Sequence, residues 1–322
     1  MQTTGADRHA LRQAYQECVQ SARSHYENFP VASTFLPRHL RGPVAAIYVF
    51  ARTADDFADE GEAPPEVRLA RLDGLASELD AVCAGQPAQT PQFLALADAI
   101  HRYGLPVQLF HDLLTAFRMD VTQRRYSDFA AVLEYCRYSA NPVGRLVLHL
   151  GGESTAENAR LSDAICSALQ LINFMQDIAQ DYAENDRIYL PLEDMAAFGV
   201  TPEDIGRRRN DTNMRQVIAV QLERILGLLQ TGAPLGLRLR GRLGLQIRLT
   251  IYGALSITTR LADPHADIYA RPRLSLQNWI WMLRKALGGR HSLRRLTWPR
   301  AMPTPGEPPD EALRADESVR LS

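Results

Sequence analysis

Two segments of the chain carry a line of polar residues on a helix that is otherwise apolar, and this pattern constrains the fold more than any other feature. The segments read AAIYVFARTADDFAD and LQLINFMQDIAQD. Residues three or four positions apart share one face of a helix. A surface helix shows the reverse arrangement, so these segments predict buried helices that turn their polar lines toward a cavity. The lines are Tyr48, Arg52, Asp55 and Asp59, and Gln170, Asn173, Asp177 and Asp181.

The acidic members of these lines predict a metal site. Burying carboxylates costs free energy unless they are paired with cations. An acidic helix end in solvent would explain Asp55 and Asp59 alone, but a second pair, Asp177 and Asp181, follows inward-facing amides. Carboxylate and amide oxygens are suitable Mg²⁺ ligands, and Mg²⁺ suits a diphosphate. We therefore expect the four carboxylates, assisted by Asn173, to hold Mg²⁺.

Cations and aromatic rings are expected to complete this site. Arg52 lies one turn before Asp55, while Arg187 and Tyr189 follow the second pair closely enough to fold back over it. Positive groups stabilise a departing diphosphate, and ring faces stabilise a carbocation. Residues 135–146 fit a helix–helix contact and a substrate contact equally well. The candidate rings, each of which also fits a plain core residue, are Phe29, Tyr48, Phe50, Phe110 and Tyr252.

The remaining pattern predicts one all-α domain over residues 1–287. Helical periodicity dominates, without a sustained strand pattern. From residue 288 to 322 the chain is basic and then rich in proline and acid, which predicts a disordered tail. Helices are expected at 7–27, 38–59, 66–84, 91–103, 106–122, 128–138, 142–151, 156–183, 202–208, 212–230, 236–261 and 275–287.

Composition and motifs exclude several other classes. A net charge of −1 gives no overall attraction to nucleic acid. Nucleotide-binding glycine motifs and Glu-x-x-His pairs are missing from the sequence, which argues against dinucleotide, P-loop and di-iron sites. No apolar run reaches about 18 residues and no signal peptide is recognisable, so we expect a cytoplasmic protein. Trp279, Trp281 and Trp298 among basic residues fit either a helix that caps the bundle or a peripheral membrane contact.

The motifs YxxxRxxDDxxD and QxxNxxxDxxxD, the latter followed by RIYLP, resemble those of the squalene/phytoene synthase family. The resemblance covers residues 10–285. It implies an isoprenoid-synthase helical bundle whose central cavity is closed at one end by Mg²⁺ and the diphosphate of an isoprenoid substrate. We expect catalytic roles for Tyr48, Arg52, Arg187, Tyr189 and Tyr252, substrate-binding roles for Asn28, Phe29, Arg52, Gln170, Asn173 and Arg187, and metal-binding roles for Asp55, Asp59, Asn173, Asp177 and Asp181. The resemblance implies the roles of the motif residues, which are all of these except Asn28, Phe29 and Tyr252.

Within that family, HYENFPVASTFLP, FARTADDFADEG and YCRYSANPVGRL look most like the hopanoid-pathway hydroxysqualene synthases. These enzymes convert presqualene diphosphate and water to hydroxysqualene and diphosphate. Relatives that join two prenyl diphosphates carry Ser-x-Ser after the histidine that corresponds to His25, whereas this chain has Tyr26, Glu27 and Asn28. The difference favours a C30 diphosphate that is already joined. The alternatives are a presqualene-diphosphate or squalene synthase, a phytoene synthase, and a non-catalytic scaffold; other enzymes of the pathway are expected partners.

Overall fold

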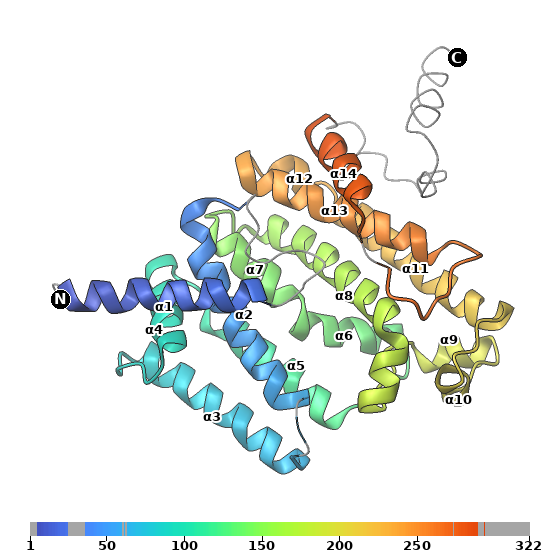
Figure 1. The fold of residues 1–322 in the computed structure, drawn as a ribbon, viewed down its shortest axis with the longest axis horizontal. Helices are drawn as coiled ribbons and strands as arrows, with labels where there is room; N and C mark the ends of the chain where they lie inside the picture. Colours follow the sequence, from blue (N-terminus) through green and yellow to red (C-terminus); the bar gives the residue numbers. More distant parts are fainter. Residues whose placement is uncertain are drawn as a thin grey trace.

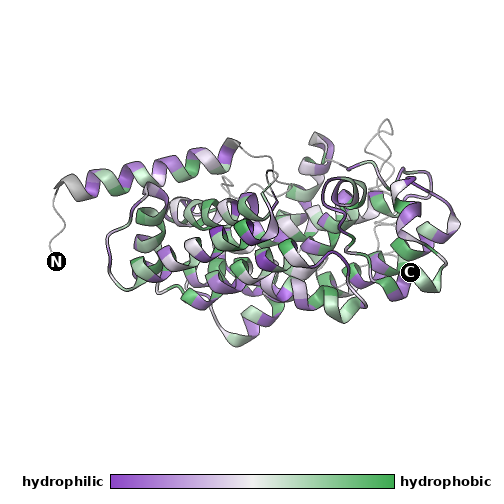
Figure 2. Ribbon diagram, turned by 90° about the horizontal axis from the view of Figure 1, so that it is seen from below, coloured by the Kyte–Doolittle hydropathy of each residue, from purple (hydrophilic) through white to green (hydrophobic). Residues whose placement is uncertain are grey.

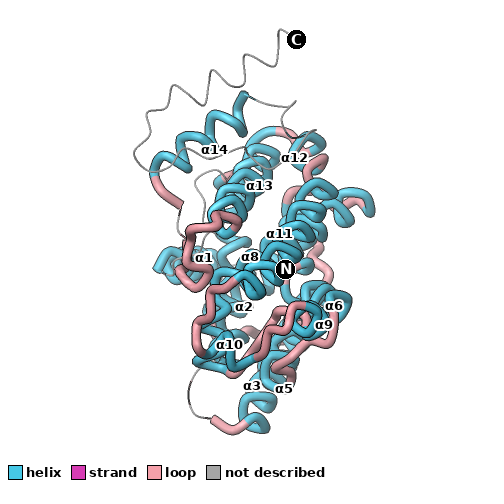
Figure 3. Tube along the Cα trace, turned by 90° about the vertical axis from the view of Figure 1, so that its right-hand side faces the viewer, coloured by secondary structure: helices cyan, strands magenta, loops and turns pink. Residues whose placement is uncertain are grey.

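Helices form nearly all of the regular structure (Figure 1). The structure is a computed structural model that describes residues 5–24, 36–59, 61, 63–272, 274–288 and 293. Within those ranges there is no β-strand, which confirms the all-α prediction; helices joined by loops are seen in Figure 3. The helices are α1 (Gly5–Ser24), α2 (Arg38–Asp59), α3 (Pro65–Cys83), α4 (Pro91–Tyr103), α5 (Val107–Thr122), α6 (Phe129–Ser139), α7 (Asn141–Leu150), α8 (Ala156–Asn185), α9 (Leu192–Ala197), α10 (Pro202–Gly206), α11 (Thr212–Gly232), α12 (Leu235–Arg238), α13 (Gly241–Leu261) and α14 (Leu276–Gly288).

Helix α2, which carries the first polar line, is held from several sides. It packs against α1, α3, α4 and α5. Phe50 on its apolar face makes edge-to-face contacts with Phe93 and Phe110, at centroid distances of 6.2 and 5.4 Å. Helix α1 lies along the outside of the bundle (Figure 2). It approaches α2 and α4 closely because small side chains form the contact. These are Ala14, Cys18 and Ala22, against Ala45, Ala46 and Ala95.

Helix α8, which carries the second polar line, packs against α7, α11 and α13. Its contact with α7 depends on Gly144. A Cβ atom at Gly144 would lie 2.3 Å from Ser162 Oγ and 2.5 Å from Cys166 Sγ. The helix–helix contact that the sequence allows for residues 135–146 is therefore confirmed at this glycine.

Two features differ from the expected helices. The short helix α9 was not expected, and the predicted helix 236–261 is divided into α12 and α13. The division follows from the backbone, because Leu239 is extended and Gly241 has a φ of 60°. Residues 25–27 of the first expected helix lie outside the described residues.

Helix α14 covers α13 at the end of the described chain. Trp281 contacts Tyr252 edge to face at 5.7 Å, and Met282 is buried, so the expectation of a capping helix is confirmed. On the outer side, Ile280 and Leu287 are 53% and 67% exposed. None of the described helices is long and apolar enough to cross a bilayer. Trp298 and most of the tail lie outside the described ranges, so the boundary after residue 287 stays a prediction.

Candidate active site

The polar line of α2 lies at the edge of the buried core. Tyr48, Arg52, Asp55 and Asp59 are all half-buried, whereas Phe50, Ala54 and Ala58 between them are buried. Arg52 forms ion pairs along the helix, from Nη1 to Asp55 Oδ2 at 3.1 Å and from Nε to Asp56 Oδ1 at 2.7 Å. The buried neighbours are Ala45, Ala46, Ile47, Phe50, Ala54 and Ala58.

The polar line of α8 has the same character. Gln170, Asn173, Asp177 and Asp181 are half-buried along a helix whose neighbouring residues include buried Leu171, Ile172, Phe174, Met175 and Ile178. The loop before α14 supplies a cation that the sequence did not indicate. Nε of Arg271 lies 3.0 Å from Asp177 Oδ1.

The end of α8 turns the chain back over its own last carboxylate. Asp186 adopts a left-handed conformation with a φ of 49°, and the Arg187 N–H donates to the Asp181 carbonyl at 3.0 Å. This is a common way to end a helix and satisfy its last carbonyls. The following residue, Ile188, donates to the Arg124 carbonyl at 2.9 Å, so the segment after α8 runs beside the segment after α5. The predicted return of Arg187 over the site is confirmed.

Arg187 joins the two polar lines. Its guanidinium contacts both oxygens of Asp59, with Nη2 to Oδ1 at 2.8 Å and Nη1 to Oδ2 at 3.3 Å. It also donates to the Asp120 carbonyl at 2.9 Å, and its side chain is only 6% exposed. A buried guanidinium that contacts both carboxylate oxygens fixes direction as well as distance. The ends of α2 and α8 therefore form one site.

A buried carboxylate that the sequence analysis missed supports Arg187. Asp120 accepts hydrogen bonds from the hydroxyls of Tyr135 at 2.8 Å and Tyr189 at 2.9 Å. Burial raises the pKa of Asp120 to about 6, against the opposing effect of Arg187. A signal was present, because Asp120 continues the buried face of α5. That face is Leu109, Leu113 and Ala116, at spacings of four, three and four.

Aromatic rings form a wall beside these charges. Phe174 stacks on Tyr189 with a centroid distance of 3.7 Å and an interplanar angle of 6°. A cavity of about 10 Å³ lies next to this stack, which is room for about one water molecule. Its lining residues are Phe174, Ile178, Asp181, Arg187, Ile188, Tyr189 and Leu190.

The cluster carries more negative than positive groups. Burial and the Asp59 carboxylate raise the pKa of Asp55 to about 7. Burial and the Asp177 carboxylate raise the pKa of Asp181 to about 7, although Arg187 opposes the shift. A divalent cation would relieve this repulsion. The carboxylates are Asp55, Asp56, Asp59, Asp120, Asp177 and Asp181, against the guanidinium groups of Arg52, Arg187 and Arg271.

Other predicted site residues take different positions. Tyr48 packs against the small-residue cluster beneath α1, and Tyr252 lies buried on α13 against Trp281. Phe50 and Phe110 contact each other in the core. Asn28 and Phe29 lie outside the described residues. In the parts of the chain that the structure describes, no three acidic, histidine or cysteine side chains already converge as a metal-binding group.

The fold and the paired carboxylate lines define an all-α isoprenoid synthase. The chain belongs to the squalene/phytoene synthase family, whose sequence model matches residues 5–280. It is 41% identical to a hydroxysqualene synthase of Rhodopseudomonas palustris, over 71% of this chain and 77% of that protein. It is 38% identical to a hydroxysqualene synthase of Zymomonas mobilis, over 77% and 84% of the two chains. The crystal structure of squalene synthase HpnC from Alicyclobacillus acidocaldarius superposes with a TM-score of 0.72 at 42% identity, over 78% of this chain and 94% of that one.

Proposed function

We propose that this enzyme is a hydroxysqualene synthase, which converts presqualene diphosphate and water to hydroxysqualene and diphosphate. The observation that carries the proposal is the meeting of the two Asp lines at the Arg187–Asp59 ion pair, in a chain similar to hydroxysqualene synthases. The family acts on isoprenoid diphosphates, and the site combines carboxylates, guanidinium groups and aromatic rings. These are the groups needed to bind a diphosphate and to shelter a carbocation.

The cofactor in this proposal is Mg²⁺, with ligands from Asp55, Asp59, Asp177 and Asp181 and assistance from Asn173. The donor set fits, because these are hard oxygen ligands and burial with mutual repulsion raises the pKa of Asp55 and Asp181. Bound Mg²⁺ would supply positive charge to the departing diphosphate.

The residues of the chain perform the other tasks in this proposal. Arg52 and Arg187 donate to diphosphate oxygens, and the ion pair with Asp59 keeps the guanidinium of Arg187 at the site. The stacked rings of Phe174 and Tyr189 shelter the carbocation from bulk water.

The test offers the purified enzyme farnesyl diphosphate, geranylgeranyl diphosphate and presqualene diphosphate separately, with Mg²⁺, in ¹⁸O-labelled water, with and without NADPH. We expect presqualene diphosphate to give hydroxysqualene that carries ¹⁸O, without NADPH. Strict NADPH dependence with squalene as the product would instead identify a squalene synthase. Efficient conversion of geranylgeranyl diphosphate to phytoene would identify a phytoene synthase, and no turnover of any substrate would favour a scaffold.

We also propose that the substrate range is narrowed by Tyr26 and Asn28, which stand where condensing relatives carry serines. Both residues lie outside the described ranges. A bulky phenol and an amide do not replace two small hydroxyl donors. Farnesyl diphosphate should therefore be a poor substrate, and a Tyr26→Ser, Asn28→Ser variant should accept it better while still converting presqualene diphosphate. Rapid farnesyl condensation by the unaltered enzyme would contradict this proposal.

We further propose a cytoplasmic enzyme that touches the membrane through the outer face of α14, where Ile280 and Leu287 are exposed beside Arg284. Ile280→Gln with Leu287→Gln should weaken co-sedimentation with vesicles of anionic lipid. Val67→Gln, at a 42% exposed position on α3, is the matched control. Equal vesicle binding by the unaltered enzyme, the double variant and the Val67→Gln variant would contradict the proposed membrane contact of α14.

A further inference from the structure

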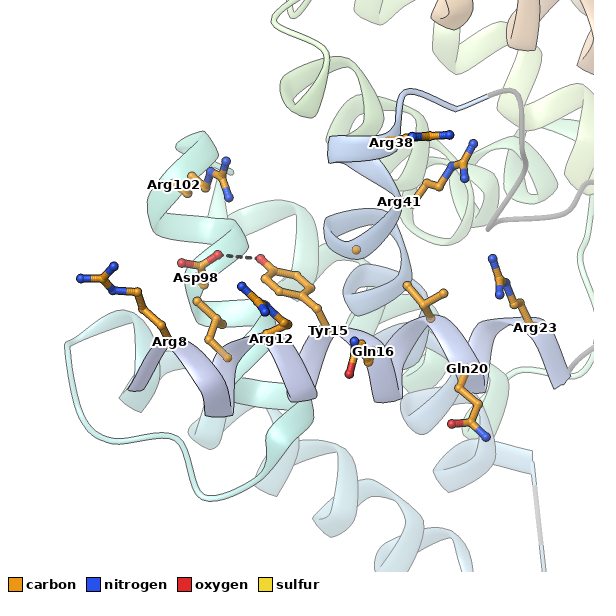
Figure 4. Close-up of a pocket in the computed structure, with 13 residues that line it drawn as sticks. Arg8, Arg12, Tyr15, Gln16, Gln20, Arg23, Arg38, Arg41, Asp98 and Arg102 are labelled. Atoms are coloured by element: carbon orange, nitrogen blue, oxygen red, sulfur yellow. Dashed lines mark hydrogen bonds between the residues drawn. The ribbon is translucent and has the colours of Figure 1, made fainter. Parts of the chain in front are cut away.

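An arginine-rich groove lies between α1, the start of α2 and α4 (Figure 4). Its volume is about 760 Å³. Figure 4 shows the arginines of α1 rising toward the side on which those of α2 and α4 lie. The six that line the groove are Arg8, Arg12, Arg23, Arg38, Arg41 and Arg102.

Arginines outnumber carboxylates by six to one among the described residues that line the groove. Among its described lining residues Asp98 is the only carboxylate. The Tyr15 hydroxyl donates to Asp98 Oδ2 at 2.7 Å, and burial together with this hydrogen bond raises the pKa of Tyr15. This excess of guanidinium groups among the described lining residues favours the binding of an anion.

The floor of the groove is apolar and closely fitted. Tyr15 packs over Gly42, where a Cβ atom would lie 2.9 Å from the tyrosine ring. Leu11 and Val19 continue this floor along α1 at spacings of four. The Nε of Arg41 donates to the Leu36 carbonyl at 3.3 Å, which helps to place its guanidinium on the rim. A cationic rim around an apolar floor suits a ligand that has an anionic head and an apolar part.

The groove is distinct from the carboxylate site. Arg41 and Asp55 are fourteen positions apart on the same helix. At the rise of an α-helix this separation is about 21 Å along the axis of α2. A ligand bound by the arginine rim therefore has a different binding site from a substrate held at the Asp lines.

We propose that this groove binds a phosphate-bearing anion. Guanidinium groups bind the oxygens of a phosphate with two parallel hydrogen bonds. A phosphate also carries more negative charge than a carboxylate, which suits a rim of several arginines. The phosphate can belong to a soluble compound or to the headgroup of a lipid, and both present the same chemistry to the rim. The volume of about 760 Å³ leaves room for an apolar part over Tyr15.

Two probes separate these sources: inorganic pyrophosphate, and vesicles of phosphatidylglycerol compared with phosphatidylcholine. Binding is measured in EDTA, so that the carboxylate site has no metal with which to hold a phosphate. The groove variant is Arg12→Gln, Arg38→Gln, Arg102→Gln, one change in each helix. The control variant removes the same charge from exposed arginines of α3, α6 and α8: Arg71→Gln, Arg137→Gln, Arg160→Gln.

We expect at least a tenfold loss of affinity in the groove variant and less than a twofold loss in the control variant. If the groove variant loses affinity for pyrophosphate, a soluble phosphate compound is enough to occupy the groove. A loss confined to phosphatidylglycerol vesicles identifies a lipid headgroup. If neither probe binds, or if the two variants lose affinity equally, the proposal is wrong. Circular dichroism of both variants excludes unfolding as the cause of a loss.

Discussion

Helix α2 joins two regions of opposite charge that are built in different ways. At its start, arginines from three helices, most of them exposed, surround a groove, and Asp98 is the only carboxylate among the described residues that line it. Near its end, carboxylates are half-buried and connected to α5 and α8 through Arg187. A buried network of charges depends on every member, because losing one leaves another uncompensated. Exposed charges are screened by water and tolerate change. Substitutions should therefore act strongly at the acidic end and weakly on folding at the basic end.

The largest expected effect comes from the acidic end. Asp55→Asn or Asp181→Asn should lower kcat for presqualene diphosphate by about a hundredfold to a thousandfold or more, because charge stabilisation at the leaving group is lost. The measurement is product formation at saturating Mg²⁺. The control is the variant with Arg71, Arg137 and Arg160 changed to Gln, which should keep full activity. Undiminished turnover after metal is removed with EDTA would show that the carboxylates have another purpose.

A smaller effect on kcat is expected at Asp120, which supports Arg187 and Tyr189. Asp120→Asn keeps the shape but removes the charge that helps to hold Arg187 and Tyr189. Losing such a support costs about tenfold to a hundredfold in comparable sites. We expect kcat to fall and KM to change little.

Asp194→Asn provides the matched control for this positioning role. Asp194 is also buried and binds an arginine, Arg224, but it lies on α9. It should lower the free energy of unfolding without changing kcat of the folded protein. Equal kcat values for the two variants would contradict the role of Asp120.

The pH dependence of stability should reveal the raised pKa values. Asp55 and Asp181 have pKa values of about 7 in the folded protein, above the usual 3.8. Their contribution to stability is complete below about pH 4 and is lost as the pH rises through 7. Without metal, Tm should fall between pH 6 and pH 8, and Mg²⁺ should raise Tm more at pH 8. The fall in Tm between pH 6 and pH 8, measured by calorimetry, should be smaller in the Asp55→Asn, Asp181→Asn variant. Identical profiles of Tm against pH for the variant and the unaltered enzyme would contradict the raised pKa values.

The smallest expected effect is on stability, at the contact between α7 and α8 that supports the second polar line. Gly144→Ala should lower the free energy of unfolding by about 1–3 kcal/mol, because its Cβ would overlap Ser162 and Cys166 of α8. Gly74→Ala on α3 has open space around it and should stabilise the protein by about 0.5–1 kcal/mol. Urea unfolding measures both. If both substitutions changed the free energy of unfolding in the same direction, the α7–α8 contact would not be the tight contact that we infer at Gly144.

Periodicity in the sequence was enough to predict the long helices and the two polar lines, because both are local patterns, but it missed the short helix α9 and the break between α12 and α13. The return of Arg187 was predictable from its position after Asp181, but the ion pair with Asp59 was not, since it joins positions far apart in the chain. Asp120 was missed although it continues the buried face of α5, because one acid on a helix is a weaker signal than a repeated motif. Arg271 gave no signal before folding placed it beside Asp177.

The most direct test of the central claim, that the Asp lines of α2 and α8 form one site, is calorimetric titration of Mg²⁺ in the presence of pyrophosphate. The metal-free binding of pyrophosphate is subtracted. The proteins compared are the wild type, Asp55→Asn, Asp181→Asn and the double variant. One shared site predicts that each single variant loses most of the Mg²⁺-dependent binding and that the double variant loses little more. Additive losses, with each single variant keeping half of the bound metal, would contradict a shared site.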